Sequence, residues 1–244
     1  MKSLAILKTD SVRPEWAERF GEYPDMFQTV LKRANPNLQF AVYDVQLGEY
    51  PDRKDQHGAY LVTGSKAGVY EDHEWLPPLE NFVRDLVQAE IPLIGICFGH
   101  QLVAQALGGR VGKSDRGWGV GVHRHQWRSK PDWLAMPADD FKVLVSHQDQ
   151  VQQAPAGLEV LASSDFCPIA ALYKRGSVLT FQGHPEFVPE YSRALMVSRE
   201  DRIGDDALPK ALASLSQGHD GDALASVIVA FLQDAKSPLA GIGH

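Results

Sequence analysis

Cysteine is scarce in this chain of 244 residues, which contains only Cys97 and Cys167. Two cysteines cannot build the disulfide framework of a small secreted domain, and nothing about them requires an oxidising compartment. The apolar segment that follows Lys2 is interrupted at Lys8, too early for the core of a signal peptide. We therefore expect a cytoplasmic protein.

Long apolar runs and an excess of positive charge are missing as well. The longest apolar stretches, residues 91–98 and 223–232, fall short of the roughly 20 residues that a membrane-spanning helix needs. Lys and Arg number 24 against 31 Asp and Glu, which gives a formal net charge of -7. Such a chain has no surplus of cations to neutralise phosphates. We therefore expect neither a membrane segment nor a nucleic-acid partner.

The first half of the chain alternates short apolar runs with segments of helical spacing. The apolar runs predict strands at residues 4–7, 40–45, 60–62 and 91–97. The helical spacings predict helices at residues 14–34, 75–89 and 101–107, the last of which ends at Gly108-Gly109. Apolar strands that alternate with helices are typical of a parallel sheet with helices on both faces. The predicted fold class is therefore α/β, with a mainly parallel central sheet.

After Gly109 the pattern changes to short strand-like segments separated by turn residues. These segments are residues 118–127, 141–145, 158–162, 169–173 and 178–181. We expect them to form antiparallel hairpins that extend the same sheet. Helical segments follow from Pro189, most clearly at residues 223–232, and the tail after them is expected to fray. The predicted organisation is one domain over residues 1–190, with a helical extension over residues 191–244 packed on it.

The segment Gly95-Ile96-Cys97-Phe98-Gly99 lies between the most apolar predicted strand and the next helix. A nucleophile flanked in this way is typical of a nucleophile elbow, a strained turn that lifts the central side chain above the sheet edge. The N-terminus of the following helix favours a thiolate there, because its free N–H groups carry partial positive charge. A buried structural cysteine fits the bare pattern equally well. The choice depends on the rest of the sequence.

A candidate base and its orienting acid follow the last predicted strand. His184 and Glu186 are two residues apart, so in an extended segment both side chains leave on one face and the carboxylate can reach the imidazole. A nucleophilic cysteine needs a base, and the base needs an acceptor that fixes its tautomer. Taken alone, His184-Pro185-Glu186 is more typical of a surface loop. With Cys97 it completes the order nucleophile, base, orienter.

The two motifs together resemble the signature of the class I glutamine amidotransferase family. The resemblance rests on Gly95-Ile96-Cys97-Phe98-Gly99-His100-Gln101, Gly108-Gly109 and Gly183-His184-Pro185-Glu186. Weaker matches at residues 62–65 and 146–149 extend it over residues 1–190. The longer motifs are also similar to a stand-alone branch that includes γ-glutamyl peptidases.

This resemblance implies a triad of Cys97, His184 and Glu186 that acts on a γ-glutamyl amide through a thioester. It also implies an oxyanion hole made by the backbone N–H groups of Phe98 and Ser65. A serine tolerates positive φ less well than the glycine that the family usually has at the second of these positions.

Further residues are expected, on the same grounds, to contact the substrate. Gln101 follows the nucleophile by four residues, which puts it one helical turn on, where it can read the amino-acid end of the substrate. The other expected contacts are Gly64 and Gln148. The resemblance implies a small γ-glutamyl substrate, glutamine or a γ-glutamyl peptide, and no cofactor or metal.

Three functions remain open on the sequence. The first is a glutaminase or amidotransferase that hands ammonia to an acceptor, with a separate synthase subunit as partner. The second is a γ-glutamyl peptidase that needs no acceptor. The third is a non-catalytic binding relative, against which the presence of all three triad residues argues.

The remaining histidines and the second cysteine carry weaker signals. His123 and His125 alternate on a predicted strand without a third ligand nearby, so we expect them to face solvent rather than a metal. His100 is expected to be structural, and the segment around His147 to contribute mainly backbone contacts. Cys167 is expected to be inert.

Overall fold

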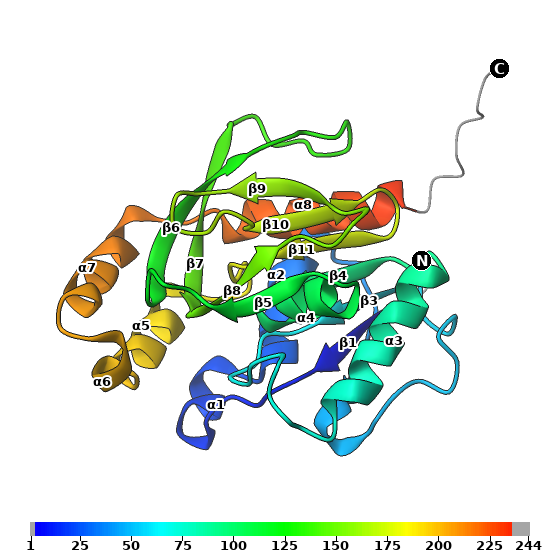
Figure 1. The fold of residues 1–244 in the computed structure, drawn as a ribbon, viewed down its shortest axis with the longest axis horizontal. Coiled ribbons are helices and arrows are strands. Elements are labelled where there is room, and N and C mark those ends of the chain that lie inside the picture. The colour runs from blue at the N-terminus through cyan, green and yellow to red at the C-terminus, as the bar shows by residue number, and fades with distance from the viewer. Residues whose placement is uncertain (1–2, 236–244) are drawn as a thin grey trace.

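The computed structural model describes residues 3–235 and has a nine-stranded mixed sheet at its centre (Figure 1). Its strands, in chain order, are β1 (Leu4–Lys8), β2 (Phe40–Asp44), β3 (Ala59–Val62), β4 (Leu93–Ile96), β6 (Gly119–Trp127), β7 (Asp140–His147), β9 (Glu159–Ser163), β10 (Ala171–Lys174) and β11 (Val178–Phe181). They follow the order β2-β1-β3-β4-β11-β10-β9-β6-β7 across the sheet. The first five are parallel, and the strands beyond β11 pair antiparallel. A separate antiparallel pair joins β5 (Arg110–Lys113) and β8 (Asp149–Gln153).

Helices cover both faces of the large sheet (Figure 1). They are α1 (Pro14–Phe20), α2 (Tyr23–Ala34), α3 (Leu76–Gln88), α4 (Phe98–Ala106), α5 (Pro189–Val197), α6 (Glu200–Ile203), α7 (Ala207–Ser214) and α8 (Gly221–Asp234), with short 3-10 turns at Val45–Leu47 and Leu215–Gln217. Alternate side chains of β1 divide between the faces, as the period of a strand requires. Leu4 and Ile6 pack with α2 and α8, whereas Ala5 and Leu7 pack with α3 and α4. The expected α/β class is confirmed.

Strand β11 corrects one detail of the expected topology. The antiparallel extension of the sheet is present, and β11 pairs antiparallel with β10 as its hairpin partner. On its other side, however, β11 pairs parallel with β4, with Phe181 opposite Ile96. A strand from the second half of the chain therefore returns to the middle of the parallel core. The small sheet of β5 and β8 was not foreseen from the sequence either.

The helix expected over residues 14–34 is in fact two helices, so that prediction was wrong. Gly21 separates them with a φ of 74°, a left-handed value that ends α1. Glu22 then caps α2 through a reciprocal pair, because its backbone N–H donates to the Asp25 side chain at 2.9 Å. The apolar spacing runs through this break, which is why periodicity alone did not reveal it.

The C-terminal helices pack at two places. Helix α8 lies against α2 on one face of the sheet, while α5 and α7 pack on β6 and β7. The tail that was expected to fray lies outside the described residues. Within residues 3–235, no helix has the length and apolar character needed to cross a bilayer.

Candidate active site

Cys97 joins β4 to α4 in a strained turn. Its φ of 52° and ψ of −99° are values that residues with side chains rarely adopt. Its two glycine neighbours have no room for a side chain. A Cβ on Gly95 would lie 2.6 Å from the carbonyl oxygen of Gly99, and a Cβ on Gly99 would overlap the carbonyl oxygen of Val62. The structure therefore has the elbow geometry that the sequence predicts.

The parallel pairing of β4 with β11 brings the second motif to Cys97. The backbone N–H of Cys97 donates to the carbonyl of Phe181 at 2.8 Å, so the two chain segments leave the sheet side by side. His184 and Cys97 then face each other across Gly64. A Cβ on Gly64 would lie 3.0 Å from His184 Cε1 and 3.7 Å from Cys97 Cβ, so this position also has little room for a side chain.

His184 is held by two buried neighbours. Its Nδ1 donates to Oε1 of Glu186 at 2.7 Å, and both side chains are almost fully buried. The ring of Phe187 stacks on the imidazole with the centroids 3.9 Å apart and the planes 7° from parallel. The predicted reach of Glu186 to His184 is confirmed. Because Nδ1 is occupied by Glu186, Nε2 remains for Cys97.

The surroundings of His184 keep it protonated. Burial lowers its pKa, but the charges of Glu186 and Cys97, together with hydrogen bonds to both, outweigh burial and raise the pKa to about 10. At neutral pH His184 is therefore an imidazolium with a proton available on the side of Cys97. This is the state that a general acid needs when an amine leaves.

Two glutamine amides form the wall beside Cys97. Gln182 Nε2 donates to Cys97 Sγ at 3.6 Å, and its Oε1 accepts from Gln101 Nε2 at 3.1 Å. Gln101 Nε2 also donates to the carbonyl of Asp149 at 2.9 Å. Gln101 and Gln148 both line the cavity at Cys97, where the sequence predicts substrate contacts.

The loop after β3 is tied to β1 through Thr9 and Asp10. The hydroxyl of Thr9 donates to the carbonyl of Gly64 at 3.0 Å. Asp10, whose side chain is 5% exposed, accepts from the backbone N–H of Lys66 at 2.9 Å and from its ammonium at 2.7 Å. Ser65 lies between these two anchored residues, and its φ is outside the positive range. The loop therefore holds its shape without glycine at that position.

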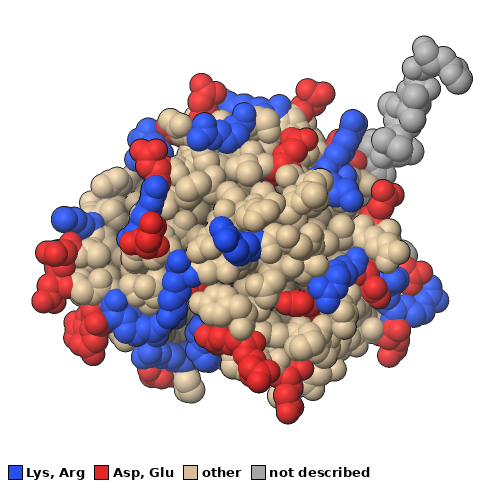
Figure 2. All heavy atoms as spheres, in the orientation of Figure 1, with Lys and Arg blue, Asp and Glu red and all other residues tan. Residues whose placement is uncertain are grey.

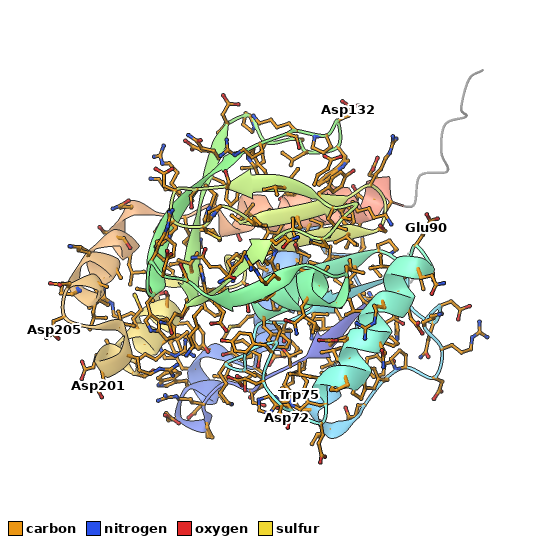
Figure 3. The ribbon with its side chains drawn as sticks, in the orientation of Figure 1. Asp72, Trp75, Glu90, Asp132, Asp201 and Asp205 are labelled. Atoms are coloured by element: carbon orange, nitrogen blue, oxygen red, sulfur yellow. The ribbon has the colours of Figure 1, made fainter. Side chains whose placement is uncertain are left out.

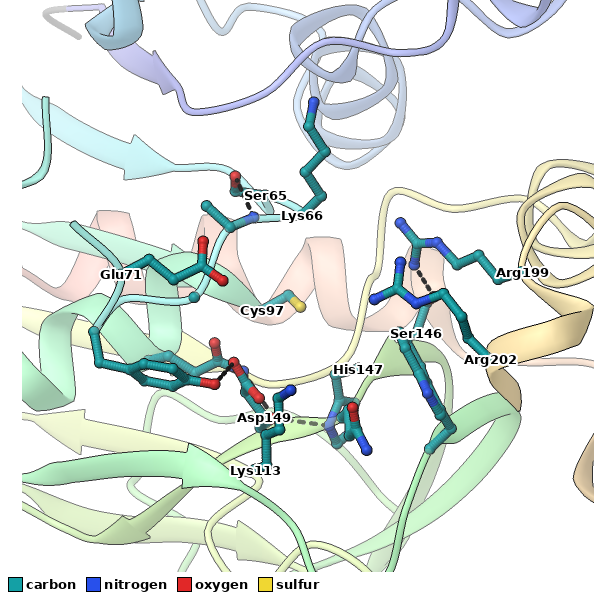
Figure 4. A pocket seen from close by; sticks show the side chains of 16 residues that line it. Ser65, Lys66, Glu71, Cys97, Lys113, Ser146, His147, Asp149, Arg199 and Arg202 are labelled. Carbon is teal, nitrogen blue, oxygen red and sulfur yellow. Dashed lines mark hydrogen bonds between the residues drawn. The ribbon is translucent and has the colours of Figure 1, made fainter. Parts of the chain in front are cut away.

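The cavity at Cys97 has two differently charged sides, which Figure 4 shows from close by. Glu71, Asp149 and Lys113 lie on one side of the thiol, whereas Arg199 and Arg202 extend toward it from the other. Over the outer face drawn in Figure 2, by contrast, acidic and basic side chains are interspersed. The charge separation is thus a property of the cavity.

Comparison with known proteins agrees with this geometry. A family model described as glutamine amidotransferase class-I matches residues 66–200. The chain is 31% identical to a Saccharomyces cerevisiae protein whose name places it provisionally among the glutamine amidotransferases, over 83% of this chain and 86% of that one. The chain belongs to the class I glutamine amidotransferase family.

This amidotransferase-family protein is also similar to a protein named as a peptidase and to a solved structure. It is 26% identical to γ-glutamyl peptidase 2 of Arabidopsis thaliana, over 76% of this chain and 75% of that one. Its fold matches the crystal structure of a glutamine amidotransferase from Thermotoga maritima with a TM-score of 0.74 and 19% identity, covering 97% of this chain and 100% of that chain.

The expectations for His100 and His125 have opposite outcomes. His100 is structural as expected: it is fully buried, bonds to Thr180 Oγ1 at 2.7 Å and to the Ile169 carbonyl at 3.0 Å, and burial lowers its pKa to about 4. His125, expected to face solvent, is instead 1% exposed and packs on Phe141. His125 lies opposite Phe141 of the paired strand β7, on the same face of β6 as the buried Trp127. Within residues 3–235, no group of three or more metal-ligating side chains gathers.

Several cavity residues were missed by the reading of the sequence. Trp118, Arg199 and Arg202 belong to no motif of the family, and Arg202 lies beyond the residues matched by the family model. Tyr70 donates to the carboxylate of Asp149 at 3.0 Å across the other end of the cavity. Nothing in their local sequence marks them: Tyr70 and Trp118 lie in loops, and Arg199 and Arg202 belong to the short helix α6 and its N-cap.

The raised pKa of His184 predicts a pH dependence of stability. An unfolded histidine titrates at about pH 6.5. Protonated His184 therefore contributes its full stabilisation of the folded chain below that pH, and this contribution is lost as the pH rises toward about 10. We therefore expect Glu186→Gln to lower the unfolding free energy more at about pH 6 than at about pH 10. Urea unfolding of both proteins at the two pH values measures this. An equal loss at both would contradict the ion pair.

Proposed function

We propose that the protein hydrolyses a γ-glutamyl amide through Cys97, His184 and Glu186. The observation that carries the proposal is the strained Cys97 turn beside a buried imidazolium that Glu186 orients. A nucleophile, a proton donor and an orienting carboxylate in hydrogen-bond sequence are what covalent acyl transfer requires. Membership of the amidotransferase family supports a γ-glutamyl group as the acyl part.

In this mechanism Cys97 Sγ attacks the γ-carbonyl carbon and forms a tetrahedral oxyanion. The backbone N–H groups of Phe98 and Ser65 stabilise that oxyanion, each donor contributing about 3 kcal/mol. The C–N bond then breaks while His184 gives its proton to the departing nitrogen, which leaves a thioester. His184 next takes a proton from water, which attacks the thioester and releases glutamate and the Cys97 thiolate, so that the thiolate and the imidazolium are restored.

The glutamyl end of the substrate is assigned to the side of the cavity that holds Gln101. Gln148 lines the same cavity, and Glu71 and Asp149 supply negative charge for an α-ammonium group. Gly64 has no side chain that could block the approach of the reacting carbonyl to Cys97 and His184. These contacts orient the γ-carbonyl toward Sγ, which is the positioning that makes the attack effectively intramolecular.

Two versions of this function differ in the group that leaves. In the first, glutamine releases ammonia, which passes to an acceptor carried by a separate synthase subunit. In the second, a γ-glutamyl peptide releases an amine and no acceptor is needed. The similarity to γ-glutamyl peptidase 2 over three quarters of each chain supports the second, and the similarity to the Saccharomyces cerevisiae relative supports the first.

A panel of γ-glutamyl amides tests the proposal. Glutamine, a γ-glutamyl dipeptide and glutathione are incubated with the protein, and glutamate, ammonia and amine are quantified separately. Glutamate release from any of them supports γ-glutamyl hydrolysis, and the ratio of ammonia to amine separates the two versions. If no glutamate is released and Cys97 resists a glutamine-like electrophile, the protein is a non-catalytic relative.

Asp10 is expected to position the oxyanion loop without touching substrate. Replacing it by Ala removes both bonds that hold Lys66, so the neighbouring Ser65 N–H loses its fixed direction. We expect kcat to fall about 10- to 100-fold with little change in KM, since loss of a whole oxyanion donor costs roughly 100- to 1,000-fold. Steady-state kinetics on the best substrate of the panel measure the split.

Two further variants, one at Asp10 and one on the surface, serve as comparisons for Asp10→Ala. Asp10→Asn keeps an oxygen for the Lys66 N–H and is expected to retain an intermediate kcat. Asp139→Ala removes an ion pair of the same length, 2.7 Å to Lys130, from the exposed surface and serves as the control. A wild-type kcat for Asp10→Ala would show that the loop needs no anchor.

A further inference from the structure

Arg199 and Arg202 share one aromatic ring at the edge of the cavity. Their guanidinium carbons lie 5.8 Å and 5.1 Å from the ring centroid of Trp118. Arg199 Nη1 also donates to the hydroxyl of Ser146 at 3.0 Å. Trp118 therefore holds two cations close to each other and directs them into the same space.

No carboxylate among residues 3–235 forms an ion pair with either arginine. Their acidic neighbours in sequence, Asp201 and Asp205, point outward from the rim of the molecule in Figure 3. Burial, and to a smaller degree the charge of Arg202, lowers the pKa of Arg199. Two adjacent cations with no carboxylate paired to either are an unfavourable arrangement that a bound anion would relieve.

The position of this pair relative to His184 identifies the part of the substrate that it faces. Arg199 lines the main cavity and also a smaller hollow bounded by Cys97, His184 and Gly64. Figure 4 shows both guanidinium groups across the thiol from Glu71 and Asp149. If His184 protonates the departing nitrogen, the leaving group lies on the side of His184 and Arg199, opposite the glutamyl end.

We propose that Arg199 and Arg202, held by Trp118, form an anion subsite for the leaving group and select γ-glutamyl substrates whose amine product carries a carboxylate. A guanidinium matches a carboxylate with two parallel N–H donors, which gives direction as well as charge. Ammonia from glutamine has no group to occupy this subsite, so γ-glutamyl amino acids and peptides are the favoured class. This inference rests on the proposed γ-glutamyl hydrolysis.

A pair of substrates that differ only in one charge tests the subsite. The two are γ-glutamyl-alanine and its C-terminal amide, and the measured quantity is the ratio of their kcat/KM values. The wild type is expected to prefer the free acid by about 10- to 100-fold, which is what a charge-assisted hydrogen bond supplies. In the double variant Arg199→Gln and Arg202→Gln the ratio should fall to near unity.

Two further variants distinguish charge recognition from folding. Arg202→Lys keeps the charge and is expected to retain part of the preference. Arg193→Gln changes an exposed arginine of α5 away from the cavity and should leave the ratio at its wild-type value. Equal kcat/KM for acid and amide in the wild type, or an unchanged ratio in the double variant, would overturn the subsite.

The subsite and the proposed hydrolysis can fail separately. If the protein cleaves neither these two substrates nor a γ-glutamyl anilide, the hydrolytic function is wrong. In that case calorimetry on Cys97→Ala compares the binding of γ-glutamyl-alanine with the binding of its C-terminal amide. Tighter binding of the acid that disappears when both arginines are changed still supports the anion subsite. Equal binding of the two compounds refutes it.

Discussion

Cys97→Ala is expected to lower γ-glutamyl hydrolysis by about four orders of magnitude or more, because no thioester can form without the thiol. The side chain lost is small, and its Sγ receives a long hydrogen bond of 3.6 Å from Gln182 and one from His184. We therefore expect the unfolding free energy to stay within about 1 kcal/mol of the wild type. Kinetics on the best γ-glutamyl substrate and urea unfolding measure the two quantities.

Cys167 offers a matched control within the same chain. It is fully buried, its Sγ lies 3.5 Å from the Ile169 carbonyl, and burial raises its pKa to about 12, so it is a neutral thiol. Cys167→Ala should keep full turnover at a cost of about 1 kcal/mol in stability. Turnover that survives in Cys97→Ala and is lost in Cys167→Ala would mean that the nucleophile is wrongly assigned.

Gly99→Ala is expected to damage stability and activity together. An alanine in the interior of a helix such as α4 would otherwise stabilise it by about 1 kcal/mol relative to glycine. Here the new Cβ overlaps the Val62 carbonyl, which is backbone and cannot move aside as a side chain would. We expect the unfolding free energy to fall by about 2–3 kcal/mol.

In Gly99→Ala the same overlap is expected to move apart the two N–H donors of the proposed oxyanion hole. Val62 ends β3 and leads into the loop that carries Ser65, whereas Gly99 follows Phe98 in the first turn of α4. Pushing them apart moves one N–H donor away from the other, and kcat should fall at least about 10-fold. Urea unfolding and steady-state kinetics on the variant test both effects.

Gly108→Ala separates backbone strain from steric overlap. Gly108 has a φ of +90° and no atom within 4 Å of an added Cβ, so alanine there costs only the strain, about 1–2 kcal/mol, and leaves turnover unchanged. A Gly99→Ala protein as stable and active as the wild type would show that β3 and α4 can separate without consequence.

The local parts of the site were predictable because their causes lie within a few residues. The glycines around Cys97 mark a turn with positive φ, and the spacing of His184 and Glu186 puts two side chains on one face. Both features are present, with a φ of 52° and a hydrogen bond of 2.7 Å. Their catalytic role stays a prediction, as do the substrate contacts of Gln101, Gln148 and Gly64 and the division of the chain at residue 190.

The parts that were missed depend on which elements become neighbours. His125 alternates with solvent-facing residues along β6, yet it is buried beside Phe141, which lies opposite it on the paired strand β7. Trp118 and Arg199 are 81 residues apart in the sequence, yet the guanidinium of Arg199 lies over the ring of Trp118. The apolar periodicity within a segment does not indicate which distant segments become its neighbours.

The alternation of short apolar runs with helical spacings determined the α/β class, and the two motifs determined the family and the candidate nucleophile, base and acid. Only the tertiary structure decided that β11 lies beside β4, which brings His184 to Cys97, and that two arginines to which no carboxylate of residues 3–235 is paired face the thiol. The physical reason is that backbone strain and side-chain alternation act over a few residues, whereas strand order and charge pairing are settled by packing across the whole chain.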